Sequence, residues 1–160
     1  MRELNINSYF NDSTFGIEFS QTDRQMNRHG IPFRISNESG MDNISCLGQE
    51  IKINDTIEEM YFLGYCEAEA FREKIIFQTP HGEIDRYLDF STIDQINPIG
   101  WVYDRDLILK NRSYFVYDVI KEHNQNFYLY CCVVHCSKQY VETIKLPDLE
   151  LMHILAITVR

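Results

Sequence analysis

The stretch Lys74-Ile-Ile-Phe-Gln-Thr-Pro-His-Gly-Glu-Ile-Asp-Arg-Tyr-Leu-Asp-Phe90 contains two β-like segments joined by a turn. Lys74–Thr79 is rich in β-branched and aromatic residues, which pack well on a pleated, half-buried surface. Pro80-His81-Gly82 has turn chemistry, because proline fixes φ and glycine accepts a positive φ. Apolar and polar residues then alternate through Glu83–Phe90. The stretch therefore predicts two strands around a tight turn.

Strand signals recur on both sides of this stretch at a spacing of roughly 8–15 residues. Met60–Cys66 is a continuous apolar run, which predicts a strand buried on both sides. Phe127–Cys136 and Leu151–Val159 are the longest candidates. Further predicted strands are Gly16–Ser20, Ile31–Ile35, Gln49–Ile53, Ile99–Asp104, Tyr114–Ile120 and Val141–Leu146.

Helical signals are few. Thr56–Met60 and Glu67–Lys74 look locally helical, with a turn predicted before the first at Asn54-Asp55. Neither segment is long enough to form a βαβ crossover, so an α/β fold is disfavoured. We expect an all-β protein, a two-sheet antiparallel β-sandwich. Because no repeat, low-complexity tract or Pro/Gly/Ser-rich linker divides the chain, residues 1–160 are predicted to form a single domain.

The composition limits the classes of partner. The formal net charge is −9, and no basic run offsets it. Nucleic acids and anionic membrane surfaces are disfavoured, because their binding depends on Lys and Arg neutralising phosphates. The chain contains no apolar run long enough to span a membrane, and no apolar signal segment follows Met1. Five cysteines without paired spacing indicate reduced thiols, so a cytoplasmic location is expected.

A family resemblance rests on the order of several short motifs. They are Gly30-Ile-Pro-Phe33, Asn43-Ile-Ser-Cys-Leu-Gly-Gln-Glu-Ile-Lys-Ile53, Ile57-Glu-Glu-Met-Tyr-Phe-Leu-Gly64, Lys74-Ile-Ile-Phe-Gln-Thr-Pro-His-Gly82, Tyr87-Leu-Asp-Phe-Ser91, Thr143-Ile-Lys-Leu-Pro-Asp148 and His153-Ile-Leu-Ala-Ile-Thr158. In this order they resemble bacterial galactose-binding-like modules, β-sandwiches appended to glycosidases and other carbohydrate-active proteins. The resemblance implies a jelly-roll fold and an association with sugar binding. The chain departs from the family pattern at His81-Gly82, where the resembled modules carry Asp-Gly, and at Ser91-Thr-Ile-Asp94, which replaces an aspartate-tryptophan pair.

Trp101 and Tyr103 are the main ligand-binding candidates. They share one face of the predicted strand, and aromatic rings pack against the C–H faces of sugars. Arg105, flanked by two aspartates, supplies polar groups beside these rings, and His81 at the predicted turn tip is a further hydroxyl-binding candidate. The alternatives are that Trp101 packs in the core or at a sheet edge and that His81 is simply solvated.

No cofactor is expected. Cys131-Cys-Val-Val-His-Cys136 contains zinc-ligand residue types, but successive strand residues point to opposite faces, so one ion cannot collect them. A structural calcium ion held by Asp42-Asn43 or by Asp104 and Asp106 is left as an alternative, although calcium needs six to eight oxygen ligands.

The expected function is that of a non-catalytic carbohydrate-binding, lectin-like module. The sequence contains no glycine-flanked nucleophile and no glycine-rich phosphate-binding loop. It also contains no acid/base residues at the spacing of a known catalytic motif, so an enzyme is not expected. The alternative is a protein-interaction or self-associating β-sandwich domain with no sugar ligand. In that case tyrosine-rich strands would pair two copies into a homodimer.

Overall fold

The computed structural model describes residues 1–14, 24–37, 39–94, 114–122 and 124–160. Within these ranges the chain forms strands and one short 3-10 helix. The elements are β1 (Arg2–Glu3), η1 (Asn7–Tyr9), β2 (Arg24–Arg28), β3 (Ile31–Ile35), β4 (Ile44–Leu47), β5 (Glu50–Cys66), β6 (Phe71–Thr79), β7 (Gly82–Phe90), β8 (Tyr114–Glu122), β9 (Gln125–Lys145) and β10 (Asp148–Val159). No helix in these ranges has the length and apolarity needed to cross a bilayer.

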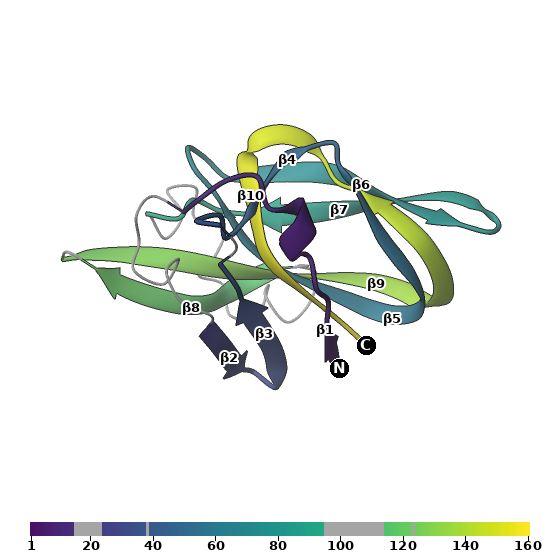
Figure 1. Cartoon of the computed structure of the whole chain (residues 1–160), viewed down its shortest axis with the longest axis horizontal. Coiled ribbons are helices and arrows are strands. Elements are labelled where there is room, and N and C mark those ends of the chain that lie inside the picture. The colour runs from purple at the N-terminus through teal and green to yellow at the C-terminus, as the bar shows by residue number, and fades with distance from the viewer. Residues whose placement is uncertain (15–23, 38, 95–113, 123) are drawn as a thin grey trace.

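The strands form two antiparallel sheets (Figure 1). The larger sheet has the order β1-β10-β5-β9-β6-β7, with β4 added to β10 and β8 added to β9. The smaller sheet is the β2–β3 hairpin, closed by His29 and Gly30, which both have positive φ. Two central positive-φ residues are typical of a hairpin turn that matches strand twist. The predicted all-β, antiparallel β-sandwich is confirmed.

The long strands β5 and β9 connect the layers of the sandwich. They pair from Glu50↔Lys145 to Gly64↔Tyr130, with register shifts between Lys52 and Asp55 and between Ile57 and Glu59. Each shift marks a bulge, which bends a strand and increases its twist. As a result, the end of β9 pairs with β6, whereas the end of β5 pairs with β10.

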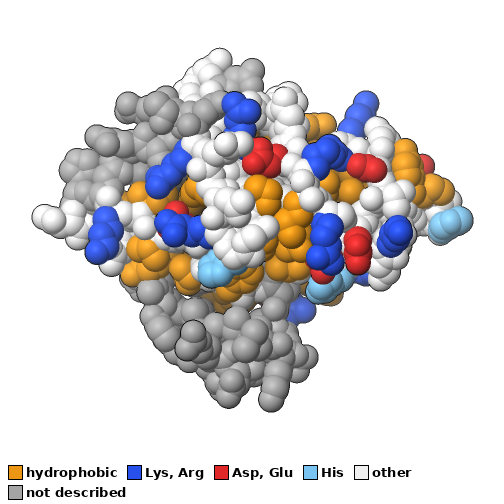
Figure 2. All heavy atoms as spheres, turned by 90° about the horizontal axis from the view of Figure 1, so that it is seen from below, with side chains coloured by type: hydrophobic (Ala, Val, Ile, Leu, Met, Phe, Trp, Pro, Cys, Tyr) orange, Lys and Arg blue, Asp and Glu red, His pale blue; other side chains and the backbone are white. Residues whose placement is uncertain are grey.

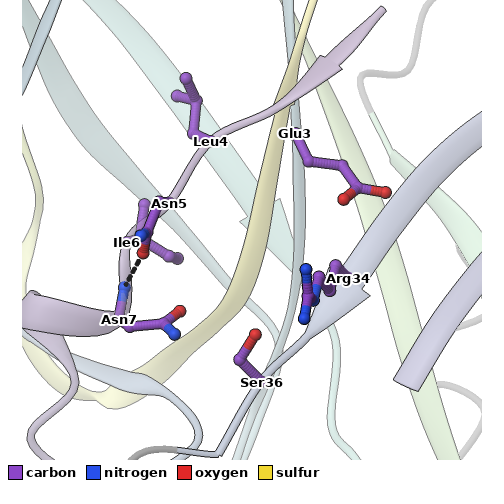
Figure 3. Close-up of a pocket in the computed structure, with 7 residues that line it drawn as sticks. All are labelled: Glu3, Leu4, Asn5, Ile6, Asn7, Arg34 and Ser36. Atoms are coloured by element: carbon purple, nitrogen blue, oxygen red, sulfur yellow. Dashed lines mark hydrogen bonds between the residues drawn. The ribbon is translucent and has the colours of Figure 1, made fainter. Parts of the chain in front are cut away.

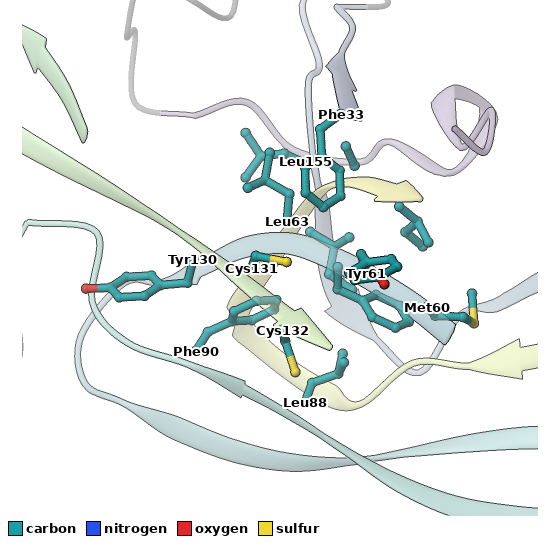
Figure 4. Close-up of a cluster of buried hydrophobic side chains, with 14 of the residues drawn as sticks. Phe33, Met60, Tyr61, Leu63, Leu88, Phe90, Tyr130, Cys131, Cys132 and Leu155 are labelled. Atoms are coloured by element: carbon teal, nitrogen blue, oxygen red, sulfur yellow. The ribbon is translucent and has the colours of Figure 1, made fainter. Parts of the chain in front are cut away.

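The core lies on both faces of β5 and β9 (Figure 4). On one face, Cys132 lies beside Leu88 of β7, and its sulfur accepts a hydrogen bond from the Asp89 amide at 3.5 Å. On the opposite face, Leu63 lies with Phe33 of β3 and Leu155 of β10. All five of these apolar side chains are fully buried. Side chains that alternate along β5 and β9 are therefore buried on both faces of these strands, in two separate packing layers.

Several local predictions are confirmed. Ile31–Ile35 is β3, and Lys74–Thr79 lies within β6. The turn at Pro80-His81-Gly82 closes the β6–β7 hairpin, in which Thr79 pairs with Gly82. The predicted strands Gly16–Ser20 and Ile99–Asp104 lie outside the described residues.

Other local predictions are wrong. Thr56–Met60 is not helical but lies within β5, and Asn54-Asp55 is a bulge with positive φ at Asn54 rather than a turn. Glu67–Lys74 is not helical either: its first residues form bends, and β6 begins at Phe71. Val141–Leu146 is not a separate strand, since β9 continues to Lys145. Pairing of β5 with β9 outweighs the local preference at residues 54–60 and 141–146, and pairing of β6 with β7 does so at Phe71–Lys74.

Candidate functional site

The ligand-binding residues predicted from the sequence are not brought together in the described structure. Trp101, Tyr103 and Arg105 lie outside the described residues, as do the calcium candidates Asp104 and Asp106. His81 is exposed at the tip of the β6–β7 hairpin, where its amide donates to Thr79 Oγ1 at 3.2 Å. The predicted aromatic platform stays a prediction.

A pocket of about 290 Å³ lies between the start of the chain and β3 (Figure 3). Its lining residues are Glu3, Leu4, Asn5, Ile6, Asn7, Arg34 and Ser36. β1 is held against β10 by pairing of Arg2 with Val159, and the Leu4 amide extends this contact by donating to Ile157 O at 2.9 Å. Asn5 Oδ1 accepts from the Asn7 amide at 3.1 Å, which turns the chain into η1.

The polar groups of this pocket surround one space. Figure 3 shows Glu3 and Arg34 on one side of it, Ser36 below them, and Asn7 across from them. Together with Asn5, they offer a carboxylate, a guanidinium group, a hydroxyl and two amides. Such a set contains both donors and acceptors, so it can pair with a ligand that carries several hydroxyl groups.

A second polar cluster is buried near β4 and β10. Asp12 and Asn43 form an antiparallel bridge, in which each backbone amide donates to the other residue's carbonyl at 3.3 Å. Asp42 is fully buried, and its Oδ1 accepts from Thr14 N at 2.9 Å, Thr14 Oγ1 at 2.8 Å and Asn43 Nδ2 at 2.9 Å. Tyr65 donates its hydroxyl to Thr14 Oγ1 at 3.4 Å. The network fixes these side chains from three segments of the chain.

His153 is the centre of this cluster. It pairs with Ser45 of β4 on one side and with Tyr65 of β5 on the other. The register of β10 shifts just before it, against β4, and just after it, against β5. The imidazole stacks on the Tyr65 ring, with centroids 4.8 Å apart and an interplanar angle of 12°. Glu67 follows β5 and is held near His153 because its amide donates to Leu151 O at 3.0 Å.

The surroundings of His153 shift two pKa values. Burial lowers the pKa of His153, because desolvation disfavours the charged imidazolium, while the carboxylate of Asp12 opposes this effect. Burial also raises the pKa of Glu67, and the nearby carboxylates of Asp12 and Glu150 raise it further. A neutral imidazole and a crowded group of acids therefore lie side by side.

The cysteine run forms no joint site in the structure. Figure 4 shows Cys131 and Cys132 on opposite sides of β9, as the alternation predicts. His135 is exposed, with Nδ1 3.1 Å from Glu59 Oε1, whereas all five cysteines of the chain are buried free thiols. Burial raises the pKa of the Cys66 thiol to about 12 and that of Cys136 to about 11, so neither thiol is a ready thiolate.

Asp12, Glu67 and His153 were not predicted from the sequence as site residues. They come from the turn-rich start, a loop after β5 and the last strand, and no local spacing connects them. One signal was available: His153 is the single histidine within the apolar run Leu151–Val159. Its partners were not predictable, because they depend on the register of three strands.

One comparison places the chain in a protein family. A protein-family model described as an AziU2-like beta-sandwich domain matches residues 7–160. No curated protein matches the chain. The matched range contains the buried cluster around His153 and, from the pocket, Asn7, Arg34 and Ser36, whereas residues 3–6 of the pocket precede it.

Proposed function

We propose that this chain, which belongs to the AziU2-like beta-sandwich domain family, is a non-catalytic module that binds a small polyhydroxylated ligand such as a carbohydrate. The pocket between β1, η1 and β3 is the observation that carries the proposal. The proposal includes the closer kinship with galactose-binding-like jelly rolls, which rests on the motif order from Gly30 onward. A cytoplasmic location is also proposed, supported by the five free thiols.

The size and lining of the pocket suit one small polar molecule. Its volume of about 290 Å³ is near the lower end of the ~300–1,000 Å³ that ligand pockets occupy. Five of its seven lining residues are polar. Sugar hydroxyls both donate and accept hydrogen bonds, and the carboxylate of Glu3 and the guanidinium of Arg34 supply the two complementary kinds of partner. The partly buried side chain of Leu4, which lines the pocket, adds an apolar surface for C–H groups.

Calorimetric titration with a panel of monosaccharides and short oligosaccharides tests this proposal. Arg34→Ala is expected to weaken binding of the best sugar by about 10–100-fold, because a hydrogen bond to a charged group contributes ~1.5–3 kcal/mol. Lys121, an exposed basic residue on β8 outside the pocket lining, provides the matched control, and Lys121→Ala should leave affinity unchanged. A folded sample that binds no sugar in the panel, or a sugar bound equally by Arg34→Ala, would refute the pocket as the site.

The second candidate function is self-association into a homodimer. Tyr87 on β7 is 45% exposed and Tyr140 on β9 is 43% exposed, and β7 ends the strand order of the larger sheet within the described residues. Tyrosine combines contact area with a polar tip, which favours interfaces. Figure 2 shows hydrophobic side chains among charged ones on one face of the molecule. Light scattering after size exclusion separates the two functions, since a monomer that binds sugar excludes this alternative.

A further inference from the structure

The hydrogen bonds of Asn43 determine which nitrogen of His153 carries a proton. Asn43 Nδ2 donates to Asp42 Oδ1 and to Thr14 Oγ1, so Asn43 Oδ1 is the atom that faces the imidazole. This oxygen lies 2.9 Å from His153 Nδ1 and can only accept a hydrogen bond. The proton of a neutral His153 therefore resides on Nδ1, and Nε2 presents a lone pair.

Nε2 is buried without a hydrogen-bond partner among the described residues. The His153 side chain is 2% exposed, and its Nε2 has no partner in hydrogen-bond geometry. Glu67 Oε1 is only 3.1 Å from Nε2 but does not meet that geometry. A buried nitrogen lone pair and a carboxylate oxygen thus lie side by side without an aligned hydrogen bond between them, and a cation shared by both atoms would satisfy this arrangement.

Asp12 completes the group. One ligand atom each from Asp12, Glu67 and His153 lie within 4.8 Å of one another. Asp12 Oδ1 accepts from the Ser13 amide at 2.8 Å, and Oδ2 lies 3.5 Å from His153 Nδ1. Its side chain is 42% exposed. We infer that Asp12, Glu67 and His153 form a binding site for a divalent transition-metal ion of the Zn²⁺ class, with His153 Nε2 as the nitrogen ligand.

The distance between His153 Nε2 and Glu67 Oε1 fits a pair of metal–ligand bonds. Nε2 and Glu67 Oε1 are 3.1 Å apart. Two ligand atoms have this separation when each is bonded to one ion at ~2.1 Å and the angle between the bonds is about 95°. A mixed set of one imidazole and two carboxylates suits Zn²⁺ and its first-row neighbours. Ca²⁺ and Mg²⁺ prefer all-oxygen sets, so they fit less well. Three protein ligands also leave a coordination position for water, and Glu67, 30% exposed, lies on a solvent-accessible side.

The neighbours of the site support this inference. A metal-binding histidine usually donates its other ring N–H to a fixed acceptor, which sets the tautomer and orientation of the ring. Asn43 Oδ1 is that acceptor, and the stacked Tyr65 ring holds the imidazole plane. The inference does not depend on the pocket or on sugar binding.

Zn²⁺ alone is the probe, titrated calorimetrically into the reduced full chain, with Mg²⁺ and Ca²⁺ as comparison ions. One Zn²⁺ per chain is expected, with weaker binding of the comparison ions. Glu67→Gln and Asp12→Asn, which change partly exposed side chains, should each weaken Zn²⁺ binding by at least about 10-fold. Glu150→Gln is the matched control, because Glu150 acts on the Glu67 pKa but is not in the ligand group. It should change affinity by less than about threefold.

Imidazole NMR provides a readout specific to His153. On Zn²⁺ addition the Nε2 resonance of His153 should shift, while Nδ1 keeps its proton. His135→Gln controls for adventitious binding at the exposed pair of His135 and Glu59, and it should leave affinity unchanged. Absence of Zn²⁺ binding at millimolar concentration would overturn the site. Binding that is lost in His135→Gln, or retained in both Glu67→Gln and Asp12→Asn, would also overturn it.

Discussion

Gly64 and Tyr65 are consecutive residues of β5, but the two faces of the strand on which they lie are stabilised by different interactions. A Cβ on Gly64 would lie 2.7 Å from the Phe90 ring, on the apolar side that faces β7. Tyr65 faces the opposite way, where its ring covers His153 and its hydroxyl reaches Thr14. The apolar side is specified by volume, because close-packed interiors do not yield easily. The polar side is specified by matching donors with acceptors, because an unpaired buried group is costly.

The largest effect is expected on the apolar side of β5. Gly64→Ala would place a methyl group 2.2 Å from the His153 carbonyl oxygen and 2.7 Å from the Phe90 ring. We expect the free energy of unfolding, measured by urea denaturation, to fall by ~3 kcal/mol or more, at or beyond the upper end of overpacking costs. Adding Phe90→Leu should recover only part of the loss, since the backbone contact persists. A loss below ~1 kcal/mol would mean that the His153 backbone and the Phe90 ring can move to accommodate the added methyl group.

An intermediate effect is expected on the polar side. Thr14→Val keeps the shape of the side chain but removes the hydroxyl that donates to Asp42 and accepts from Asn43 and Tyr65. The expected loss in unfolding free energy is about 1–3 kcal/mol. Thr143→Val is the control, because the bond from Thr143 to Gln78 is only partly buried, and it should cost under ~0.5 kcal/mol. Equal losses in the two variants would show that the buried network contributes no more to the free energy of unfolding than the partly buried hydrogen bond does.

The smallest effect concerns alkaline pH, where each side contains a buried tyrosine hydroxyl. Burial raises the pKa of Tyr130 from 10.0 to about 12, and it raises the pKa of Tyr65. The unfolded chain therefore releases these protons first, so stability is full below pH ~10 and falls as the pH rises through the folded-state values. Denaturation between neutral pH and pH ~11 should show this loss, and Tyr130→Phe should make it shallower. An unchanged slope would mean that Tyr130 ionises freely in the folded protein.

The fold was predictable where one face of a strand had to be buried. Ile31–Ile35 and the hairpin around Pro80-His81-Gly82 follow from alternation and turn chemistry, and both are present as expected. Thr56–Met60 was predicted as helix because its residues favour one locally. Pairing along β5 and β9 overrides that preference, since strand stability comes from cross-strand neighbours that a local window does not contain.

The candidate sites were less predictable. Trp101, Tyr103 and Arg105 were chosen because aromatic and polar residues were adjacent in sequence. The polar groups of the pocket come instead from residues 3–7 and from Arg34 and Ser36 at the end of β3, and the His153 cluster comes from four separate segments. No local pattern encodes such groupings. They arise because antiparallel pairing brings distant residues side by side.

By itself, the sequence determined that this protein is built from strands, because alternation and continuous apolar runs leave few other ways to bury these side chains. Only the tertiary structure decided that Asp12, Glu67 and His153 meet. Their proximity depends on the register of β10 between β4 and β5, and a one-residue slip would turn His153 to the opposite face. Burial of many side chains at once selects the register, so no single segment specifies it.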